Sequence, residues 1–321
     1  MDTFSFEETQ NKFQSEIIGG LKGDPKHLLS KYFYDKKGDH LFQQIMNMPE
    51  YYLTDCELEI FTQKTADLAN AINAFDESFD LIELGAGDAT KSSFLLEYLV
   101  GQKADFTYMP IDISGNIIEV LEAKLALKIP NLHVVGLNGE YFEMLDKASK
   151  ISSKRKVILF LGSNIGNMEV EEAYHFCSEL RKKLNPGDIL LIGFDLKKNP
   201  HTILQAYNDK TGITAAFNLN LLTRINEELN ADFNIDQFQH YQTYDPLSGA
   251  CRSYLISLKD QIVAIGNQEI QFKENEAVYM EISQKYSLDE INVMAVKNGF
   301  ESLKEISDSR KWFIDAIWKV V

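Results

Sequence analysis

The strongest constraint on the fold is an alternation of short apolar runs with helical segments through the middle of the chain. The runs are strand-like in length and end in turn residues, and they read "FDLIELGAG", "FTYMPIDIS", "LHVVGLNG", "KVILFLGSN" and "GDILLIGFDL". Near-continuous apolar strands that alternate with helices indicate a parallel sheet covered by helices on both faces. We therefore predict an α/β protein with a doubly wound sheet.

Two helices carry boundary signals in the sequence. Thr54 and Glu57 match the T-x-x-E capping box, so we predict a helix over residues 54–75. Ser287 and Glu290 form a second capping box, at the start of the last helix. The strand-like residues after that helix are expected to return to the first sheet.

The alternation stops near residue 197, which indicates a second domain. Helical segments and then turn-linked strands follow, before the chain returns to the α/β pattern. The expected division is a first domain of residues 61–196 and 287–321, and a second domain of residues 1–60 and 197–286.

Charge and composition exclude several classes of partner. The chain has 48 acidic and 32 basic residues, a formal charge of -16, and this balance argues against a nucleic-acid substrate, which requires a basic surface. A hydrophobic fraction of 45% is typical of a soluble globular protein. We expect a monomer that binds a small molecule.

The cysteines indicate a reducing compartment, and the histidines give no indication of a metal site. Cys56, Cys177 and Cys251 form no C-x-x-C pair, and core packing is the preferred interpretation. The six histidines show no ligand spacing, so no metal is expected. A polar, acidic N-terminus without a signal sequence, and no apolar run of membrane-spanning length, predict a cytoplasmic protein that does not contact a membrane.

A glycine turn follows the first apolar run. Gly85 and Gly87 form a G-x-G turn at a strand end, where an α/β sheet allows a ligand to approach the backbone. The dinucleotide-binding fingerprint needs a third glycine, and Thr90 occupies that position. On these residues alone, a tight structural turn remains an alternative.

An acidic residue at the end of the next strand strengthens the prediction of a nucleotide site. Asp112 is placed to accept hydrogen bonds from both ribose hydroxyls, while Ser114 caps the following helix. Together with Glu83, the pattern E-x-G-x-G followed by a strand-end acid resembles the S-adenosylmethionine site of Rossmann-like methyltransferases. In this resemblance, Glu140 and Tyr141 would lie beside the adenine. A nicotinamide-dependent dehydrogenase remains the alternative at this point.

Further stretches make the resemblance more specific. The segments "YFYDKKGDHLFQQIMNMPEYYLT", "FLGSNIGNM", "AYNDKTGITAAFNLNLLTRINEELNADFN" and "YMEISQKYS" resemble the histidine Nα-methyltransferases of ergothioneine biosynthesis. The resemblance covers nearly the whole chain. It implies a Rossmann-like class I methyltransferase sheet that binds the cofactor, with a second, substrate-binding domain formed by the N-terminal segment and an insertion. It also implies S-adenosyl-L-methionine as cofactor, and trimethylation of the α-amine of free histidine.

The resemblance assigns residues to both ligands. Cofactor contacts would fall on Tyr34, Gly85, Gly87, Lys91, Asp112, Glu140 and Tyr141. Substrate contacts would fall on Tyr51, Asn167, Tyr207, Thr214, Glu281 and Ser283.

Two of the substrate positions hold neutral polar groups. The Asn167 amide and the Tyr207 phenol suit the amino and carboxylate groups of an amino acid. A structural turn at Asn167 and half-buried packing at Tyr207 are the alternatives that the residues alone leave open.

Glu281 and Ser283 are the candidates for contact with the imidazole ring. If residues 279–288 form a strand, Glu281, Ser283 and Lys285 share one face of it. A neutral imidazole presents one N–H donor and one nitrogen acceptor, which a carboxylate and a hydroxyl can satisfy. An ordinary exposed strand face is the alternative that periodicity alone favours.

Two departures from the family bear on the substrate. The loop "GSNIGN" replaces the more usual "GGTIGN", and Ser253 stands where the family tends to place a methionine near the imidazole. A smaller polar residue there could enlarge the pocket, so methylation of another aromatic amino acid or a related small amine is an alternative. A nicotinamide-dependent oxidoreductase and a non-catalytic binding protein are weaker alternatives from other classes.

Overall fold

The computed structural model describes the backbone of residues 3–321 and the side chains of residues 11–321. Contacts divide the chain into two compact units, each assembled from two stretches of sequence. The first unit comprises the chain up to Tyr52 together with Lys198–Ser283, and the second comprises Leu53–Lys197 and Gln284–Val321. The first boundary falls earlier in the chain than position 60, where the sequence analysis placed it.

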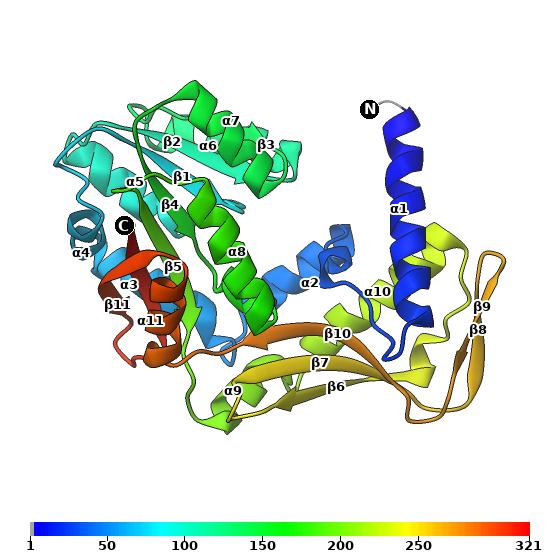
Figure 1. Cartoon of the computed structure of the whole chain (residues 1–321). Helices are drawn as coiled ribbons and strands as arrows, with labels where there is room; N and C mark the ends of the chain where they lie inside the picture. Colours follow the sequence, from blue (N-terminus) through cyan, green and yellow to red (C-terminus); the bar gives the residue numbers. More distant parts are fainter. Residues whose placement is uncertain (1–2) are drawn as a thin grey trace. The chain divides into compact units, whose positions relative to one another are not determined.

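The second unit is built around a seven-stranded sheet with the order β11-β12-β5-β4-β1-β2-β3 (Figure 1). Strands β1 to β5 run parallel, and β12 is antiparallel to both of its neighbours. The strands are β1 Phe79–Leu84, β2 Phe106–Asp112, β3 Leu137–Asn138, β4 Arg155–Phe160, β5 Ile189–Asp195, β11 Phe300–Ser307 and β12 Phe313–Val320. The predicted Rossmann-like sheet, rejoined by the last two strands, is confirmed.

Helices cover both faces of this sheet. One face packs against α7, α8 and α11 in a continuous apolar core. Residues that point to the other face, such as Leu81, Leu159 and Leu191, are also fully buried, as expected for central parallel strands. The helices of this unit are α3 Tyr52–Gln63, α4 Thr65–Ala71, α5 Ser92–Gly101, α6 Gly115–Lys128, α7 Tyr141–Ile151, α8 Val170–Lys182 and α11 Leu288–Lys297, with the short η2 Asn164–Asn167.

The single helix predicted over residues 54–75 is wrong in its boundaries. The structure has two helices, α3 and α4, with a break at Lys64, where φ is -123° and ψ is 22°. Next to the break, the Thr65 hydroxyl donates to the carbonyl of Phe61, a local hydrogen bond that bends helices. Thr54 lies inside α3 and caps nothing, because the helix already begins at Tyr52.

The other boundary signals are confirmed. The Ser114 hydroxyl accepts from the amide of Ile117 at the start of α6, and Ser287 with Glu290 forms a complete capping box at the start of α11. The third predicted strand is short, since only Leu137–Asn138 pairs regularly with β2.

The first unit contains a three-stranded sheet, order β10-β7-β6, and a separate hairpin of β8 and β9 (Figure 1). Its strands are β6 Phe238–Tyr244, β7 Ala250–Ser257, β8 Gln261–Ile265, β9 Gln268–Phe272 and β10 Ala277–Gln284. Its helices are α1 Thr3–Lys22, α2 Lys36–Met46, α9 Pro200–Tyr207 and α10 Ile213–Leu229, with the short η1 Ser30–Phe33 and η3 Ile235–Gln237.

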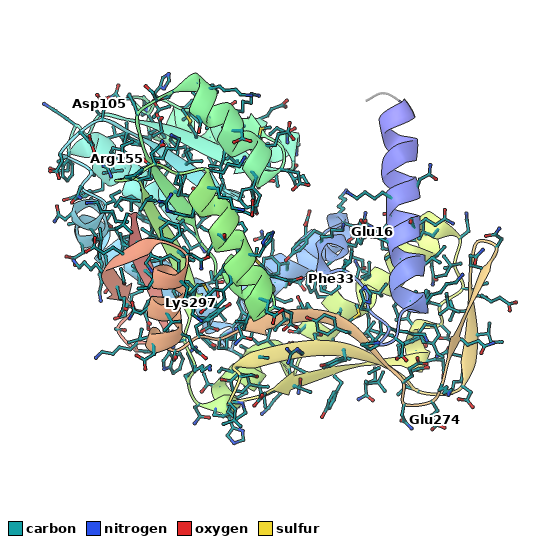
Figure 2. All side chains as sticks on the ribbon, in the orientation of Figure 1. Glu16, Phe33, Asp105, Arg155, Glu274 and Lys297 are labelled. Carbon is teal, nitrogen blue, oxygen red and sulfur yellow. The ribbon has the colours of Figure 1, made fainter. Side chains whose placement is uncertain are left out.

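A core of its own supports the first unit. Phe33 packs edge-on against Phe217 of α10 at a centroid distance of 5.0 Å, and Leu255 of β7 is fully buried in the same cluster. Figure 2 labels Phe33 together with Glu16 of α1, whose carboxylate accepts a 2.6 Å hydrogen bond from Tyr32. No helix in the described part of the chain is both long and apolar enough to cross a membrane.

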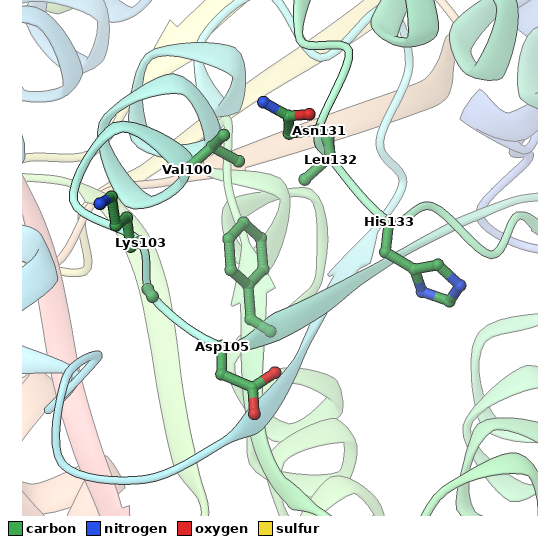
Figure 3. Close-up of a pocket in the computed structure, with 8 residues that line it drawn as sticks. Val100, Lys103, Asp105, Asn131, Leu132 and His133 are labelled. Atoms are coloured by element: carbon green, nitrogen blue, oxygen red, sulfur yellow. The ribbon is translucent and has the colours of Figure 1, made fainter.

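The amino ends of the parallel strands carry structural rather than ligand-binding features. Arg155, labelled in Figure 2, donates 3.0 Å hydrogen bonds to the carbonyls of Ile72 and Asn73. A hollow of about 400 Å³ lies beside these ends, with Asp105 and His133 in its lining (Figure 3). Ligands of open α/β sheets bind at the opposite, carboxyl ends of the strands. The hollow is therefore not the candidate site.

Candidate active site

The glycine turn lies at the carboxyl end of β1, as predicted. Gly85 and Gly87 adopt φ values of 71° and 52°, a region that favours glycine. A side chain at Gly85 would meet the Tyr141 hydroxyl at 2.8 Å, whereas nothing lies within 4 Å of the corresponding position at Gly87. The backbone at Gly87 is thus open to a ligand.

Asp112 ends β2 next to this turn. One of its oxygens accepts from the amide of Gly87 at 3.3 Å, and the other accepts from the amide of Ser114 at 3.0 Å. A carboxylate offers about four lone-pair sites, so Asp112 retains capacity for two further donors. Its position and remaining capacity fit the two hydroxyls of a ribose.

Glu140 and Tyr141 begin α7 at the same edge of the sheet. Glu140 is exposed at the N-cap position, and Tyr141 packs edge-on against Phe160 with 6.1 Å between ring centroids. Burial, aided by the negative charges of Asp112 and Glu140, raises the pKa of Tyr141 to about 12. Tyr141 therefore stays a neutral phenol that can donate a hydrogen bond at the turn.

Glu83 lies inside β1, just before the glycine turn. Its carboxyl accepts a 2.5 Å hydrogen bond from Tyr108, and burial raises its pKa to about 7 although that bond opposes the shift. Because the folded pKa exceeds the unfolded value near 4.5, the unfolded chain loses the Glu83 proton first as pH rises. Stability is consequently full below about pH 4.5 and falls as pH rises through 7.

We expect Glu83→Gln to remove this dependence, because a glutamine cannot ionise. Relative to the variant, the wild-type protein should lose about 3 kcal/mol of unfolding free energy between pH 4.5 and pH 8. Urea unfolding followed by tryptophan fluorescence measures the difference, since both tryptophans, Trp312 and Trp318, lie in the second unit. Glu119→Gln, at an exposed position of α6, is the control. A difference that stays constant with pH would contradict the prediction.

Lys91 lies near the turn but already has a partner. Its ammonium forms an ion pair with the carboxylate of Glu57, which is 1% exposed and also accepts from the amide of Gly162 at 2.9 Å. The predicted capping role of Glu57 is therefore wrong. Sequence reasoning missed this carboxylate at the site, and the one available signal was an acidic residue within an otherwise apolar helix face.

Asn167 ends η2, in the loop after β4. Its side chain is exposed, whereas Ser163, earlier in the loop, is buried with a φ of 56°. The Ser163 hydroxyl accepts from the amide of Asp195 at 3.3 Å. A side chain at Gly166 would meet the carbonyl of Gln284 at 2.9 Å, so this loop tolerates only glycine there. Ser163, which departs from the family's usual sequence, thus fixes the loop through its hydroxyl.

Glu281 and Ser283 lie on β10, but Lys285 does not belong with them. Lys285 follows the end of the strand, belongs to the second unit, and is fully buried in a 2.7 Å ion pair with Asp195. The expectation of three polar residues on one strand face is wrong for Lys285, because its ion pair with Asp195 places it in the core of the second unit.

Tyrosines accompany Ser283 in the first unit. The Tyr207 and Ser283 hydroxyls are 2.7 Å apart, and the ring of Tyr51 stands edge-on to that of Tyr207 with 5.8 Å between centroids. Glu281 lies 3.5 Å from the side-chain nitrogen of Asn218. The structure therefore brings Tyr51, Tyr207 and Ser283 together.

Thr214 and Tyr34 occupy less direct positions. Thr214 is buried, and its amide donates to Asp209 at 2.8 Å. Burial opposes ionisation of Asp209, but hydrogen bonds from Thr211 and from the backbone of Thr214 prevail and lower its pKa to about 2. Tyr34 is 47% exposed and belongs to the first unit, whereas the other predicted cofactor residues belong to the second.

No group of three or more histidine, cysteine, aspartate or glutamate residues within positions 11–321 is arranged to hold an ion. Cys56, Cys177 and Cys251 are buried free thiols.

Comparison with known proteins decides the family. The model for histidine-specific, S-adenosylmethionine-dependent methyltransferases matches residues 13–320. The chain belongs to this methyltransferase family. The predicted resemblance and the predicted cofactor, S-adenosylmethionine, are thereby confirmed.

Curated relatives of this methyltransferase support the assignment. Histidine N-alpha-methyltransferase of Mycolicibacterium smegmatis is 33% identical over 84% of this chain and 83% of its own length. The enzyme of the same name from Mycobacterium tuberculosis is 31% identical, covering 91% of this chain and 90% of the relative. Ergothioneine biosynthesis protein 1 of Neurospora crassa is 33% identical over 88% of this chain, a match that spans 32% of that longer protein.

Proposed function

We propose that this methyltransferase transfers three methyl groups to the α-amine of free L-histidine, giving the trimethylated betaine. The observation that carries the proposal is that Glu281 and Ser283 lie two residues apart on β10, and that the Ser283 hydroxyl is 2.7 Å from the hydroxyl of Tyr207, at the end of α9. A carboxylate and a hydroxyl at this spacing match the N–H donor and the nitrogen acceptor of a neutral imidazole. A relative named for ergothioneine biosynthesis is consistent with this substrate.

The residues proposed for the cofactor belong to the second unit, apart from Tyr34. S-adenosylmethionine supplies an electrophilic methyl group when bound. The open backbone at Gly87 and the remaining acceptor capacity of Asp112 fit its ribose and amino-acid portions. Further contacts are proposed for the remaining residues of the set, which are Tyr34, Gly85, Lys91, Glu140 and Tyr141.

The residues proposed for the amino acid act by orientation. Tyr207 and Asn167 would hold its amino and carboxylate groups, with Tyr51 and Thr214 as further contacts. None of these four side chains carries a charge at neutral pH, so they can position an amine without stabilising its protonated form. Each transfer needs a lone pair on that amine, so the methylated nitrogen must release a proton before the next transfer. After the third transfer no N–H remains, the lone pair cannot return, and the reaction ends.

A second candidate substrate follows from one sequence departure. Ser253 replaces the methionine typical of the family, so methylation of another aromatic amino acid is the runner-up. The structure disfavours an enlarged pocket as the reason, because Ser253 is 1% exposed and bonded on two sides, to Asn218 and to His240.

A mass-spectrometric screen tests both candidates. The purified protein is incubated with S-adenosylmethionine and each free amino acid, and products one, two or three methyl groups heavier are sought. Trimethylated histidine is the expected product. Methylation of a different amino acid, or a histidine product that stops at one methyl group, would overturn the proposal.

The proposed role of Asp112 predicts a loss confined to the cofactor. Asp112→Ala removes a charged acceptor of two ribose hydroxyls, so the dissociation constant for S-adenosylhomocysteine should rise about a hundredfold. Isothermal titration calorimetry measures it, with circular dichroism to verify folding. Asp105→Ala is the matched control, because Asp105 is a solvent-exposed acid just before the same strand, β2. Equal affinities of Asp112→Ala and wild type would refute the role.

A further inference from the structure

A series of buried, hydrogen-bonded polar side chains leads to Glu281 in the first unit. The side-chain nitrogen of Asn218, on α10, lies 3.1 Å from the carbonyl of Thr214 and 3.5 Å from Glu281. The side-chain oxygen of Asn218 lies 2.8 Å from the Ser253 hydroxyl on β7. That hydroxyl in turn lies 2.9 Å from the Nε2 atom of His240 on β6.

Burial of these polar side chains costs free energy unless every polar group has a hydrogen-bond partner. Asn218 is fully buried, Ser253 is 1% exposed and His240 is 9% exposed. A buried polar group without a partner costs about 1–3 kcal/mol, so these residues must satisfy one another. Phe217 of α10 and Leu255 of β7, apolar residues of the same elements, are buried in the core of the first unit. The buried set is therefore a built network rather than a solvated surface.

The donor and acceptor in each of these hydrogen bonds follow from the groups beside Asn218, which can only accept. The carbonyl of Thr214 and the carboxylate of Glu281 can only accept, so the amide nitrogen of Asn218 must face both of them. The oxygen of Asn218 then faces Ser253, which must donate to it. Having donated its only proton, the Ser253 hydroxyl must accept from His240, which places a proton on Nε2.

The state of His240 agrees with this order. Burial lowers the pKa of His240 to about 4, against opposing contributions from Asp209 and Gln242. The ring is consequently neutral at pH 7, and it can supply one N–H donor to Ser253. Every donor in the chain thus points toward Glu281.

We propose that Asn218, Ser253 and His240 are positioning residues, which hold Glu281 as an oriented carboxylate and thereby select a substrate ring that offers an N–H. The inference rests on the proposed function, because it concerns the contact between Glu281 and the imidazole. An oriented carboxylate rejects a ring without a donor, since an acceptor position would then lose its water without gaining a hydrogen bond from the ring. The residue at position 253 then affects selectivity through Glu281.

A double-mutant cycle separates this role from general support of the fold. In the presence of S-adenosylhomocysteine, Ser253→Ala should weaken histidine binding about fivefold to tenfold. In a Glu281→Gln background, the same change should have less than a twofold effect, because the partner it acts through is already altered. Ser253→Thr, which keeps the hydroxyl, should restore most of the affinity. Calorimetry measures the four proteins of the cycle and the Ser253→Thr variant.

A matched control exists on the same strand. Ser257 is also a fully buried hydroxyl of β7, and it bonds to Lys259 and Gln261 instead of Asn218. Ser257→Ala should leave histidine binding unchanged. An equal loss from Ser257→Ala, or the same loss from Ser253→Ala in both backgrounds, would overturn the proposal.

Nuclear magnetic resonance of the ¹⁵N-labelled protein tests the proton order without histidine as a ligand. The His240 ring, assigned by comparison with His240→Gln, should be neutral at pH 7 with its proton on Nε2, and Ser253→Ala should perturb that signal. A proton on Nδ1 would overturn the proposal. If the wild type binds S-adenosylhomocysteine but not histidine, the proposed function fails, and this experiment still decides the order of the network.

Discussion

Replacing Glu281 with alanine is expected to lower kcat/KM for histidine by about a hundredfold while leaving the affinity for S-adenosylhomocysteine unchanged. The variant leaves the imidazole N–H without its charged acceptor, a loss of roughly 2–3 kcal/mol. The residues proposed for the cofactor belong, apart from Tyr34, to the other unit. A coupled assay of methyl transfer gives the first quantity, and calorimetry gives the second.

Two comparisons make the result specific to the ring contact. Glu269→Ala removes an exposed carboxylate from β9 of the same unit and should leave both quantities at wild-type values. Glu281→Ala should also reduce the preference for histidine over phenylalanine, because a phenyl ring has no donor for the carboxylate. Parallel losses in histidine turnover and cofactor affinity would show that Glu281 does not contact the imidazole.

The second large effect concerns stability. Lys285→Met should lower the unfolding free energy of the second unit by about 3–5 kcal/mol, because it leaves the buried carboxylate of Asp195 without its countercharge. Urea unfolding followed by tryptophan fluorescence reports on this unit, which contains both tryptophans. Replacing both partners, as Lys285→Met with Asp195→Leu, should recover most of the loss, since neither charge of this pair then remains in the core.

An exposed pair provides the contrast. Lys304 contacts Asp67 at 3.4 Å, and both side chains are about half exposed. Lys304→Met should therefore change the unfolding free energy by no more than about 1 kcal/mol. Similar losses from Lys285→Met and Lys304→Met would contradict the assignment of the large effect to burial.

Local patterns in the sequence were sufficient to place the glycine turn and Asp112 in the second unit. The glycine turn and Asp112 end neighbouring parallel strands, and such ends meet at one edge of a sheet by construction. Ser114 and the Ser287–Glu290 box act within a single turn of helix, so their roles also follow from spacing.

Contacts between residues distant in sequence escaped the same reasoning. Glu57 matched a capping motif, but α3 begins two residues before Thr54, so the motif does not cap the helix. The Glu57 carboxylate instead pairs with Lys91, which is distant in sequence. The strand period placed Lys285 beside Glu281, but the chain leaves the sheet after Gln284. A period of two holds only while the strand continues, and nothing local marks that end.

Strand alternation, caps and glycine turns are local properties, so the class of fold and the position of the glycine turn at a sheet edge follow from the sequence alone, and motifs along nearly the whole chain indicated the family. Only the tertiary structure decided which polar residues are buried together. The network of Asn218, Ser253 and His240 joins α10, β7 and β6, and each residue alone is an ordinary polar side chain. Their common role arises from burial, since groups removed from water must find partners wherever the packing places them.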